Sequence, residues 1–376
     1  MAGYIISINE KKNKGAIENC FSKGIYSTIL SKPKGYWGIH HEGTFADYFG
    51  MKPGDNIYFF SDRKIYGIGK LIKLKKDCKY WNYQGADFIN KTELSSLKNT
   101  ILYDEGTNED NRCICCFEPS PLFFKEGIDM DDVLASNPSK FKMLRAFWKL
   151  SFIKIDNIEN QALIDIFLKR NEENLNTKKN VFEIDKTWHN RINQKVKDFH
   201  LMRADNILQD TAEGNKIKHE MAIEAGLVDI LSMQENSIFG KWDYISHQVV
   251  ASPFKPIDYM DKMDIYGYRY VNGYTTISKY LVMEIKKDEA DLGVVDQIMK
   301  YVDWVNTEYA YGDYSMIEAF VVASNFSEEV IERVRKLCIR NYTKGHRPTV
   351  ASEWKNIRLI KYSFDNGKLV FSEVSK

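Results

Sequence analysis

The chain contains few of the residues that interrupt or cross-link a fold: its 376 residues include 8 prolines, 22 glycines and 6 cysteines. It has no run of eighteen apolar residues, and it has no basic segment followed by a short apolar one. The first absence excludes a membrane-spanning helix, and the second excludes a secretory signal peptide. We therefore expect a cytoplasmic protein with no membrane partner.

The few cysteines do not show the paired pattern of a zinc site. Cys113, Cys115 and Cys116 lie together in Arg-Cys-Ile-Cys-Cys-Phe. A zinc site favours two C-x-x-C pairs, or one pair with histidines at ligand spacing, and the clear paired pattern of such a site does not appear in the sequence. We interpret these cysteines as strand residues of a protein in a reducing compartment.

The hydrophobic pattern changes its period near residue 125. Before this point, short apolar runs bounded by turn residues predict strands at residues 4–8, 36–40, 56–61, 64–74 and 112–117. After it, helical spacing predicts helices at residues 143–155, 159–170 and 186–210. The length allows two domains with cores. We therefore expect a β domain at residues 1–125, a helical connector at 126–200 and an α/β domain at 201–376.

The main chemical pattern lies in the last third of the chain. Residues 279–286 (KYLVMEIK) predict a buried strand in which Glu284 and Lys286 project from one face and Ile285 from the other. A surface ion pair on an edge strand would give the same pattern. However, a buried carboxylate requires a partner or a metal ion, and Asp264 lies upstream on the chain. Asp264 and Glu284 would supply oxygen ligands to Mg²⁺, and Lys286 would orient water or neutralise charge.

Two predicted helices flank this strand. Residues 216–231 place Glu220 and Glu224 four apart, and residues 294–304 place Gln297 and Tyr301 four apart, so each pair shares a helix face. Downstream, we expect a buried strand within residues 311–326 and a helix from Ser327 to about residue 341. Two more strands are expected in residues 354–373, around the Asp-Asn-Gly sequence at 365–367.

A helix glutamate, a strand aspartate, E-x-K and Q-x-x-x-Y together resemble the PD-(D/E)XK restriction-like nucleases, most of all the branch containing the NucS mismatch endonuclease. The resemblance covers roughly residues 210–305. It implies a mixed sheet flanked by helices, with Mg²⁺ or Mn²⁺ as the cofactor. It also implies roles for the residues named above: metal ligands at Asp264, Glu284 and one helix glutamate, a catalytic lysine at Lys286, and support of the site by Gln297 and Tyr301.

Two assignments within this resemblance stay open. The proline of the family motif is missing before Asp264, so Asp261 competes with it for the ligand position. Glu220 and Glu224 also share one face with Leu227 and Leu231, so periodicity does not choose between them. Glu224 is the favoured metal ligand.

The N-terminal region carries a second resemblance. Residues 35–39 (GYWGI), 51–60 (MKPGDNIYFF) and 65–70 (IYGIGK) resemble the strand, turn and strand of PUA-like domains, particularly of the EVE and YTH branch. The resemblance spans about residues 30–75 and implies a small β-barrel with a pocket for a flipped base. Aromatic residues in small barrels are also common core residues. The candidate pocket residues are Tyr36, Trp37, His40, Tyr58 and Trp81.

A basic stretch beside these aromatics is a candidate nucleic-acid face. Lys73, Lys75 and Lys76 belong to a run of basic residues between positions 63 and 79. The whole chain has a net charge of only +1, so affinity for phosphates must come from such local patches. Lysines that protect a strand edge would look the same.

Together these patterns predict a metal-dependent DNA endonuclease whose N-terminal domain selects foreign or modified DNA in a defence role. A repair nuclease acting on mismatched or branched DNA shares the same chemistry. A non-cleaving nucleic-acid sensor is the alternative from another class. Cleavage of both strands by a single site per chain would require at least a dimer.

Overall fold

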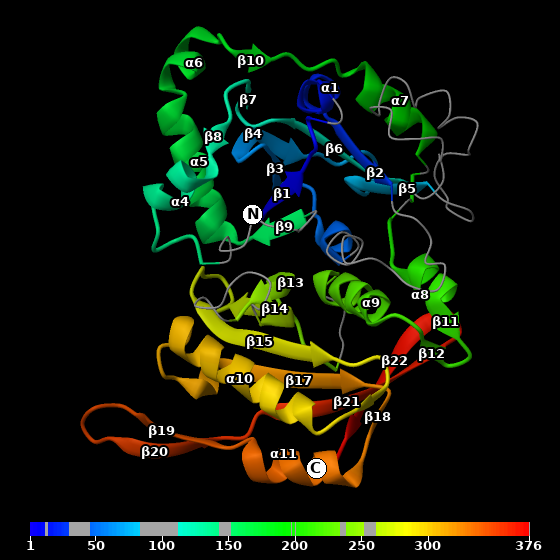
Figure 1. Ribbon diagram of the computed structural model, residues 1–376, viewed down its shortest axis with the longest axis vertical. Coiled ribbons are helices and arrows are strands. Elements are labelled where there is room, and N and C mark those ends of the chain that lie inside the picture. The colour runs from blue at the N-terminus through cyan, green and yellow to red at the C-terminus, as the bar shows by residue number, and fades with distance from the viewer. Residues whose placement is uncertain are drawn as a thin grey trace. The chain divides into compact units, whose positions relative to one another are not determined.

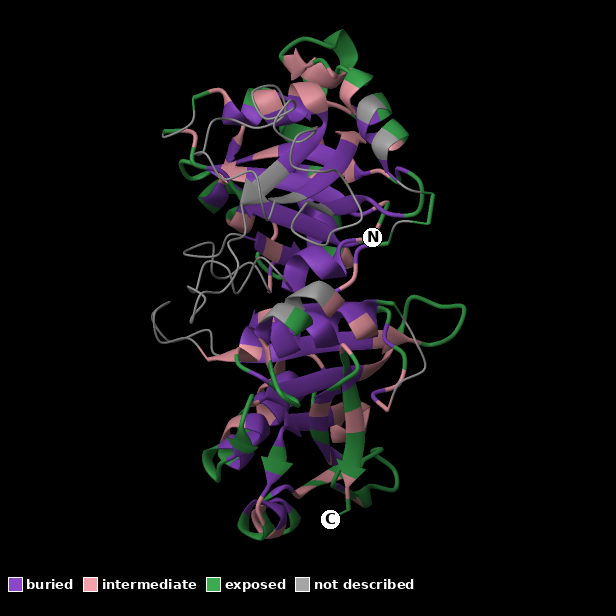
Figure 2. Cartoon of the chain, turned by 90° about the vertical axis from the view of Figure 1, so that its right-hand side faces the viewer, coloured by how far each residue is buried: buried purple, intermediate pink, exposed green. Residues whose placement is uncertain are grey.

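The computed structural model describes residues 1–11, 14–29, 46–82, 112–142, 152–196, 198–199, 201–233, 238–251 and 261–375. The chain forms two compact units, Met1–Arg203 and Ala204–Lys376. Each unit contains one large sheet with helices packed on it (Figure 1). Figure 2 shows that the buried residues of each unit gather on its central strands. No helix among the described residues is long and apolar enough to cross a membrane.

The first unit is a mixed sheet with short helices. Its strands run in the order β2-β6-β4-β3-β1-β9, in which β1 and β3 are parallel and the other neighbours are antiparallel. Its elements are β1 (Gly3–Ser7), α1 (Ala16–Lys23), β2 (Ile25–Ile29), β3 (Asn56–Ser61), β4 (Lys64–Leu71), β5 (Lys79–Asn82), β6 (Arg112–Pro119), β7 (Phe123–Phe124), β8 (Ile128–Asp129), α4 (Met130–Ser136), β9 (Phe152–Ile155), α5 (Asn157–Arg170), α6 (Glu172–Thr177), β10 (Val181–Phe182) and α7 (Thr187–Lys195).

This sheet is strongly curved. Tyr26 of β2 and Phe152 of β9, at the two ends of the strand order, have ring centroids 5.8 Å apart in an edge contact. No ladder joins β2 to β9 among the described residues, so the closed barrel expected from the sequence is not observed as a hydrogen-bonded ring. The fold of this unit is therefore a curled sheet whose ends contact through side chains.

The segment expected to be a helical connector is part of the first unit. Residues 152–155 were predicted as the end of a helix but form β9, because they pair with β1 along its full length. Residues 143–151 lie outside the described residues. Helix α5 follows at once, since the Asp156 side chain accepts hydrogen bonds from the N–H groups of Ile158 and Glu159 and caps the helix. The predicted helix 186–210 is interrupted between α7 and the first helix of the second unit.

The second unit is a six-stranded sheet in the order β13-β14-β15-β17-β21-β22. The central pairs β15/β17 and β17/β21 are parallel, and the outer pairs are antiparallel. Its elements are α8 (Asp205–Thr211), β11 (Ala212–Glu213), β12 (Lys216–Ile217), α9 (Glu220–Ser232), β13 (Tyr244–Val250), β14 (Lys262–Tyr270), β15 (Ile277–Ile285), β16 (Glu289–Ala290), α10 (Gly293–Glu308), η2 (Tyr314–Met316), β17 (Ile317–Ala323), β18 (Asn325–Phe326), α11 (Glu328–Leu337), β19 (Arg340–Lys344), β20 (Val350–Trp354), β21 (Ile357–Asp365) and β22 (Lys368–Val374).

Most elements predicted for this unit are confirmed. Helix α10 crosses from β15 to β17 and contacts both strands (Figure 1). Ser327 caps α11 by accepting a hydrogen bond from the N–H of Val330, and Asn366 and Gly367 form the predicted turn with φ of 48° and 80°. Helix α9 begins at Glu220 instead of residue 216, because Lys216 and Ile217 pair with β11. Strand β13 and the hairpin β19–β20 were not predicted.

Candidate metal centre

The candidate centre lies where β14 and β15 place acidic side chains on the face that is covered by α10. Tyr266 of β14 and Tyr280 of β15 both contact the ring of Tyr309, which caps the end of α10. Side chains two positions apart on a strand share a face. Asp264 and Glu284 therefore project from the same face of the sheet as these two tyrosines.

Three carboxylates converge at this place. Glu220, Glu224 and Asp264 each offer a ligand oxygen, and these oxygens all lie within 4.8 Å of one another. Glu220 begins α9, and Glu224 lies one turn later on the same face, so both helix glutamates reach the centre. Glu224 is 2% exposed and Asp264 is 8% exposed. The sequence left one helix glutamate to be chosen, and the structure brings both to Asp264.

The two strand carboxyls are buried side by side. Asp264 Oδ2 accepts a 2.7 Å hydrogen bond from the N–H of Ile285. Burial raises the pKa of Asp264 well above its ordinary value, and the nearby Glu284 carboxyl adds to the rise. Burial also raises the pKa of Glu284, to about 7, against the opposing effect of Lys286. Burial and repulsion thus penalise the charged forms in the protein alone, and a bound cation would offset this penalty.

Lys286 lies beside the acids and is partly open to solvent. Its Nζ donates a 2.7 Å hydrogen bond to Oε1 of Glu284, whose side chain is 1% exposed, whereas the Lys286 side chain is 27% exposed. Burial alone would lower the pKa of Lys286, but the Glu284 carboxylate outweighs it and the pKa is raised. The ammonium group is therefore held at the rim of the acidic cluster.

Sequence reasoning missed one residue of the centre, Gln248 on β13. Its Nε2 lies 3.3 Å from Oδ1 of Asp264 and 3.5 Å from Oε1 of Glu224, and it donates to both. The sequence signal was the polar pair Ser246 and Gln248, which lie two positions apart on β13 and so share a face. Only the pairing of β13 with β14 shows that this face is the one carrying Asp264.

The remaining nuclease-like candidates lie on or near α10. Gln297 donates a 3.0 Å hydrogen bond to the hydroxyl of Tyr301, which is 2% exposed. Burial raises the pKa of Tyr301, and the charges of Glu284 and Asp264 add to this effect. Asp261, the competitor of Asp264, forms an ion pair with Lys300 on α10. Asp264, and not Asp261, belongs to the three-carboxylate group.

Of the five candidate base-pocket residues in the N-terminal region, the structure describes the side chain of Tyr58. Tyr58 is fully buried in the core of the first unit, and its hydroxyl donates a 2.9 Å hydrogen bond to Asn160. This burial does not fit the expected base-contacting role, because a stacking ring must be accessible. Tyr36, Trp37 and His40, together with the Trp81 side chain, lie outside the described residues.

The three candidate lysines of the basic stretch lie on the surface, between β4 and β5. Lys75 Nζ forms an ion pair with the carboxylate of Asp198, at 2.7 Å. Lys73 and Lys76 are exposed, with no ion pair to them among the residues the structure describes. These two are therefore the better placed of the three to contact an external anion.

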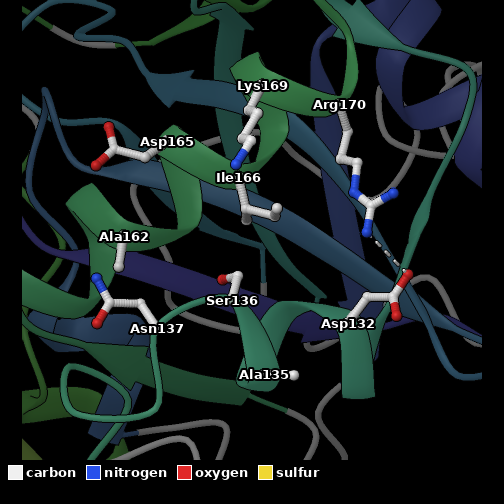
Figure 3. A pocket seen from close by; sticks show the side chains of 9 residues that line it. All are labelled: Asp132, Ala135, Ser136, Asn137, Ala162, Asp165, Ile166, Lys169 and Arg170. Carbon is white, nitrogen blue, oxygen red and sulfur yellow. Dashed lines mark ion pairs between the residues drawn. The ribbon is translucent and has the colours of Figure 1, made fainter.

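A pocket of 520 Å³ lies elsewhere, between α4 and α5 of the first unit. Figure 3 shows Arg170 pointing toward Asp132, with which it forms a 3.5 Å ion pair, and Lys169 and Asp165 lying on the same helix. All four charged side chains are exposed. The pocket thus carries balanced surface charges and lacks the buried, convergent acids of the candidate centre.

No protein-family model and no curated protein matches the chain. Among solved structures, it is similar to a repair endonuclease from Pyrococcus abyssi, with 23% identity and a TM-score of 0.22 over 34% of this chain and 46% of that chain. It is also similar to the human THYN1 protein in complex with DNA containing 5-methylcytosine, with 12% identity and a TM-score of 0.26 over 46% of this chain and 98% of that one. A further match is the DUF55 domain of human thymocyte nuclear protein 1, with 13% identity and a TM-score of 0.27 over 45% and 98%.

These matches include a NucS-like repair endonuclease and PUA-like domains, as the two resemblances in the sequence predicted. The chain spans less than half of the length of the endonuclease. All three likenesses are distant. The function proposed below therefore rests on the residues of the candidate centre.

Proposed function

We propose that the protein is a metal-dependent DNA endonuclease that uses Mg²⁺ or Mn²⁺. The observation that carries this proposal is the convergence of Glu220, Glu224 and Asp264 beside the ion pair of Glu284 and Lys286. A set of acids next to a lysine suits phosphodiester hydrolysis, because the acids can hold a cation and the lysine can orient the water or neutralise the developing charge.

The donor set fits a hard divalent cation. All ligand atoms are carboxylate oxygens, which Mg²⁺ and Mn²⁺ prefer, and no thiol or imidazole belongs to the three-residue group. Metal–oxygen bonds of about 2.1 Å bring opposite ligands to about 4.2 Å from each other. Oxygens that already lie within 4.8 Å need only small side-chain movements to share one ion.

The residues of the centre would have different roles. A bound divalent cation would supply Lewis acidity toward a phosphate oxygen and a lowered pKa for a bound water. Glu220, Glu224 and Asp264 would hold this cation, and the carboxylate of Glu284 would lie beside it. Glu284 accepts a hydrogen bond from the ammonium group of Lys286, and this group would orient the attacking water or neutralise charge on the phosphate. The complete set of acids and lysine favours cleavage over a sensor that only binds.

We propose foreign or modified DNA as the substrate, in a defence role, with the first unit selecting it. The exposed Lys73 and Lys76 support a contact with phosphates, since cations supply most of the sequence-independent affinity for DNA. Cutting both strands with one centre per chain would use a homodimer.

The test is cleavage of a matched panel of DNAs by the full chain with Mg²⁺, Mn²⁺, Ca²⁺ or excess EDTA. The panel contains plain, base-modified, mismatched, branched and single-stranded DNA of one sequence. We expect cleavage with Mg²⁺ or Mn²⁺, binding without cleavage with Ca²⁺, and a preference for modified DNA. Full activity in EDTA would contradict the mechanism, and a preference for mismatched or branched DNA would move the role to repair.

A further inference from the structure

Gln248 has an unusual backbone conformation for its place in the fold. It lies inside β13 but has φ of 51°, in the left-handed region. The other non-glycine residues with positive φ among the described residues lie in turns or at the ends of helices and strands. A side chain with a Cβ adopts this region at a cost, and such residues persist where the surroundings require them.

The pairing of β13 with β14 shows where the side chain of Gln248 lies. Ser246 pairs with Tyr266, and Val249 pairs with Met263, so Gln248 stands opposite Asp264 in the register. The ladder skips this position, and the side chain reaches both Asp264 on the neighbouring strand and Glu224 on α9. One amide –NH₂ group has two donors, so a single glutamine can hold two carboxylates.

We propose that Gln248 is a positioning residue of the metal centre, which holds the carboxylates of Glu224 and Asp264 together so that they accept one divalent cation. This inference rests on the proposed function and adds to it a neutral, uncharged contributor that the nuclease-like pattern in the sequence does not contain. Without the amide, the carboxylates of Glu224 and Asp264, which come from different elements, would lose a donor that both share.

The consequence is a specific kinetic signature. Residues that orient metal ligands typically change metal affinity by about 10- to 100-fold when they are replaced. The replacement leaves Lys286 and the carboxylates that would hold the cation unchanged. Loss of Gln248 should therefore raise the metal concentration needed for half-maximal cleavage and leave the rate at saturating metal nearly unchanged.

Two variants distinguish the role of the Gln248 side chain from that of its backbone conformation. Gln248→Met keeps the length of the side chain and removes its donors, whereas Gln248→Gly relieves the left-handed φ and removes the side chain. Gln209→Met is the control, because Gln209 is an exposed glutamine on α8 of the same unit. The measurements are Mn²⁺ binding by calorimetry and cleavage rate as a function of Mn²⁺ concentration, with thermal unfolding to check the fold.

We expect both Gln248 variants to bind Mn²⁺ about 10-fold or more weakly and to recover cleavage at high Mn²⁺, while Gln209→Met behaves as the wild type. Wild-type Mn²⁺ affinity in Gln248→Gly, with the fold retained, would overturn the inference. A lost rate that saturating Mn²⁺ does not restore would also overturn it, since the residue would then act in another way. If the wild-type chain itself neither binds Mn²⁺ nor cleaves DNA, the proposed function fails, which is a different outcome.

Discussion

Both units bury charged side chains, but they balance them differently. In the first unit, Lys79 Nζ lies 3.2 Å from Asp77, and the buried Lys154 lies close enough to Asp55 to affect its pKa. The charges of Asp47 and Lys52 also act on Lys154, so three carboxylates face three ammonium groups. In the second unit, the four carboxylates of Glu220, Glu224, Asp264 and Glu284 gather, and Lys286 is the ammonium group that pairs with Glu284 and acts on Asp264.

This difference is the one expected between a structural charge cluster and the metal centre that we propose. A buried charge is tolerated when it is paired and hydrogen-bonded, and the first cluster meets this condition with its own residues. Asp55, for example, accepts hydrogen bonds from the N–H groups of Ala2 and Lys52. The second cluster has an excess of carboxylates, and a cation from outside would balance it. Changing single charges in each cluster tests this difference.

The largest effect is expected for the strand pair of the second cluster. Glu284→Ala and Lys286→Ala should each lower the rate of DNA cleavage by on the order of 10²- to 10⁴-fold, because they remove the acid beside the cation or the ammonium group it holds. The measurement is single-turnover cleavage with Mg²⁺, together with DNA binding and thermal unfolding.

Lys279→Ala is the matched control for this pair, since Lys279 belongs to the same strand β15 but lies near its other end. Its rate should stay near that of the wild type. Wild-type turnover by either Glu284→Ala or Lys286→Ala would remove the nuclease assignment from this centre.

The same chemical change should have opposite effects on stability in the two clusters when metal is absent. Burial raises the pKa of Asp55 too, but Lys154 and the N–H groups of Ala2 and Lys52 oppose the rise. Asp55→Asn should destabilise the first unit by about 1–3 kcal/mol, because asparagine removes the charge that faces Lys154 and has one acceptor oxygen for the two N–H groups. Asp264→Asn should stabilise the second unit by about 1 kcal/mol, because it removes a carboxylate whose pKa is raised by burial and by Glu284.

Hydrogen exchange in EDTA can read the two units separately. Asp264→Asn should also abolish the stabilisation that Mn²⁺ gives to the wild type. If Asp264→Asn destabilises the second unit in EDTA, the acidic cluster is balanced internally and the comparison fails.

Local patterns predicted the elements that carry most of the candidate centre, and they failed where pairing decides the structure. Helix α10, strand β15 and the turn at Asn366 were predicted because their periodicity and turn residues are local. Residues 152–155 became β9 because β1 supplies their hydrogen bonds, which no local signal encodes. Gln248 was missed for the same reason, since its partner Asp264 is sixteen residues away in sequence and is reached through the register of β13.

A smaller effect tests whether the first cluster is as well balanced as its pairing suggests. Burial lowers the pKa of Lys154 from 10.5 to about 8, against the opposing effect of Asp55. Below pH 8, Lys154 is protonated in the folded and the unfolded chain alike. Between pH 8 and 10.5 the unfolded chain keeps a proton that the folded chain has released, so the free energy of unfolding rises with pH.

The rise should amount to about 1 kcal/mol between pH 7 and 9, and it should be absent in Lys154→Met. Urea unfolding of both proteins across this range measures the difference, and the subtraction removes the contribution of the other titrating groups. Parallel pH profiles for the wild type and Lys154→Met would show that the Lys154 charge is fully compensated in the folded state.

The smallest effects concern the surface of the first unit. Its buried charges are paired internally, so its exposed lysines are the groups available to phosphates. Lys73→Ala and Lys76→Ala should each weaken binding to all DNA sequences alike and lower the salt dependence of the affinity by about one phosphate contact. Lys75→Ala should have less effect, because Lys75 already pairs with Asp198 at 2.7 Å.

Fluorescence anisotropy with duplex DNA in EDTA, between 50 and 200 mM salt, measures the salt dependence of the affinity as a slope, and Lys169→Ala on α5 is the control. Equal slopes for Lys73→Ala, Lys76→Ala and the control would place the phosphate-binding surface elsewhere, and the first unit would then be a module for another kind of partner.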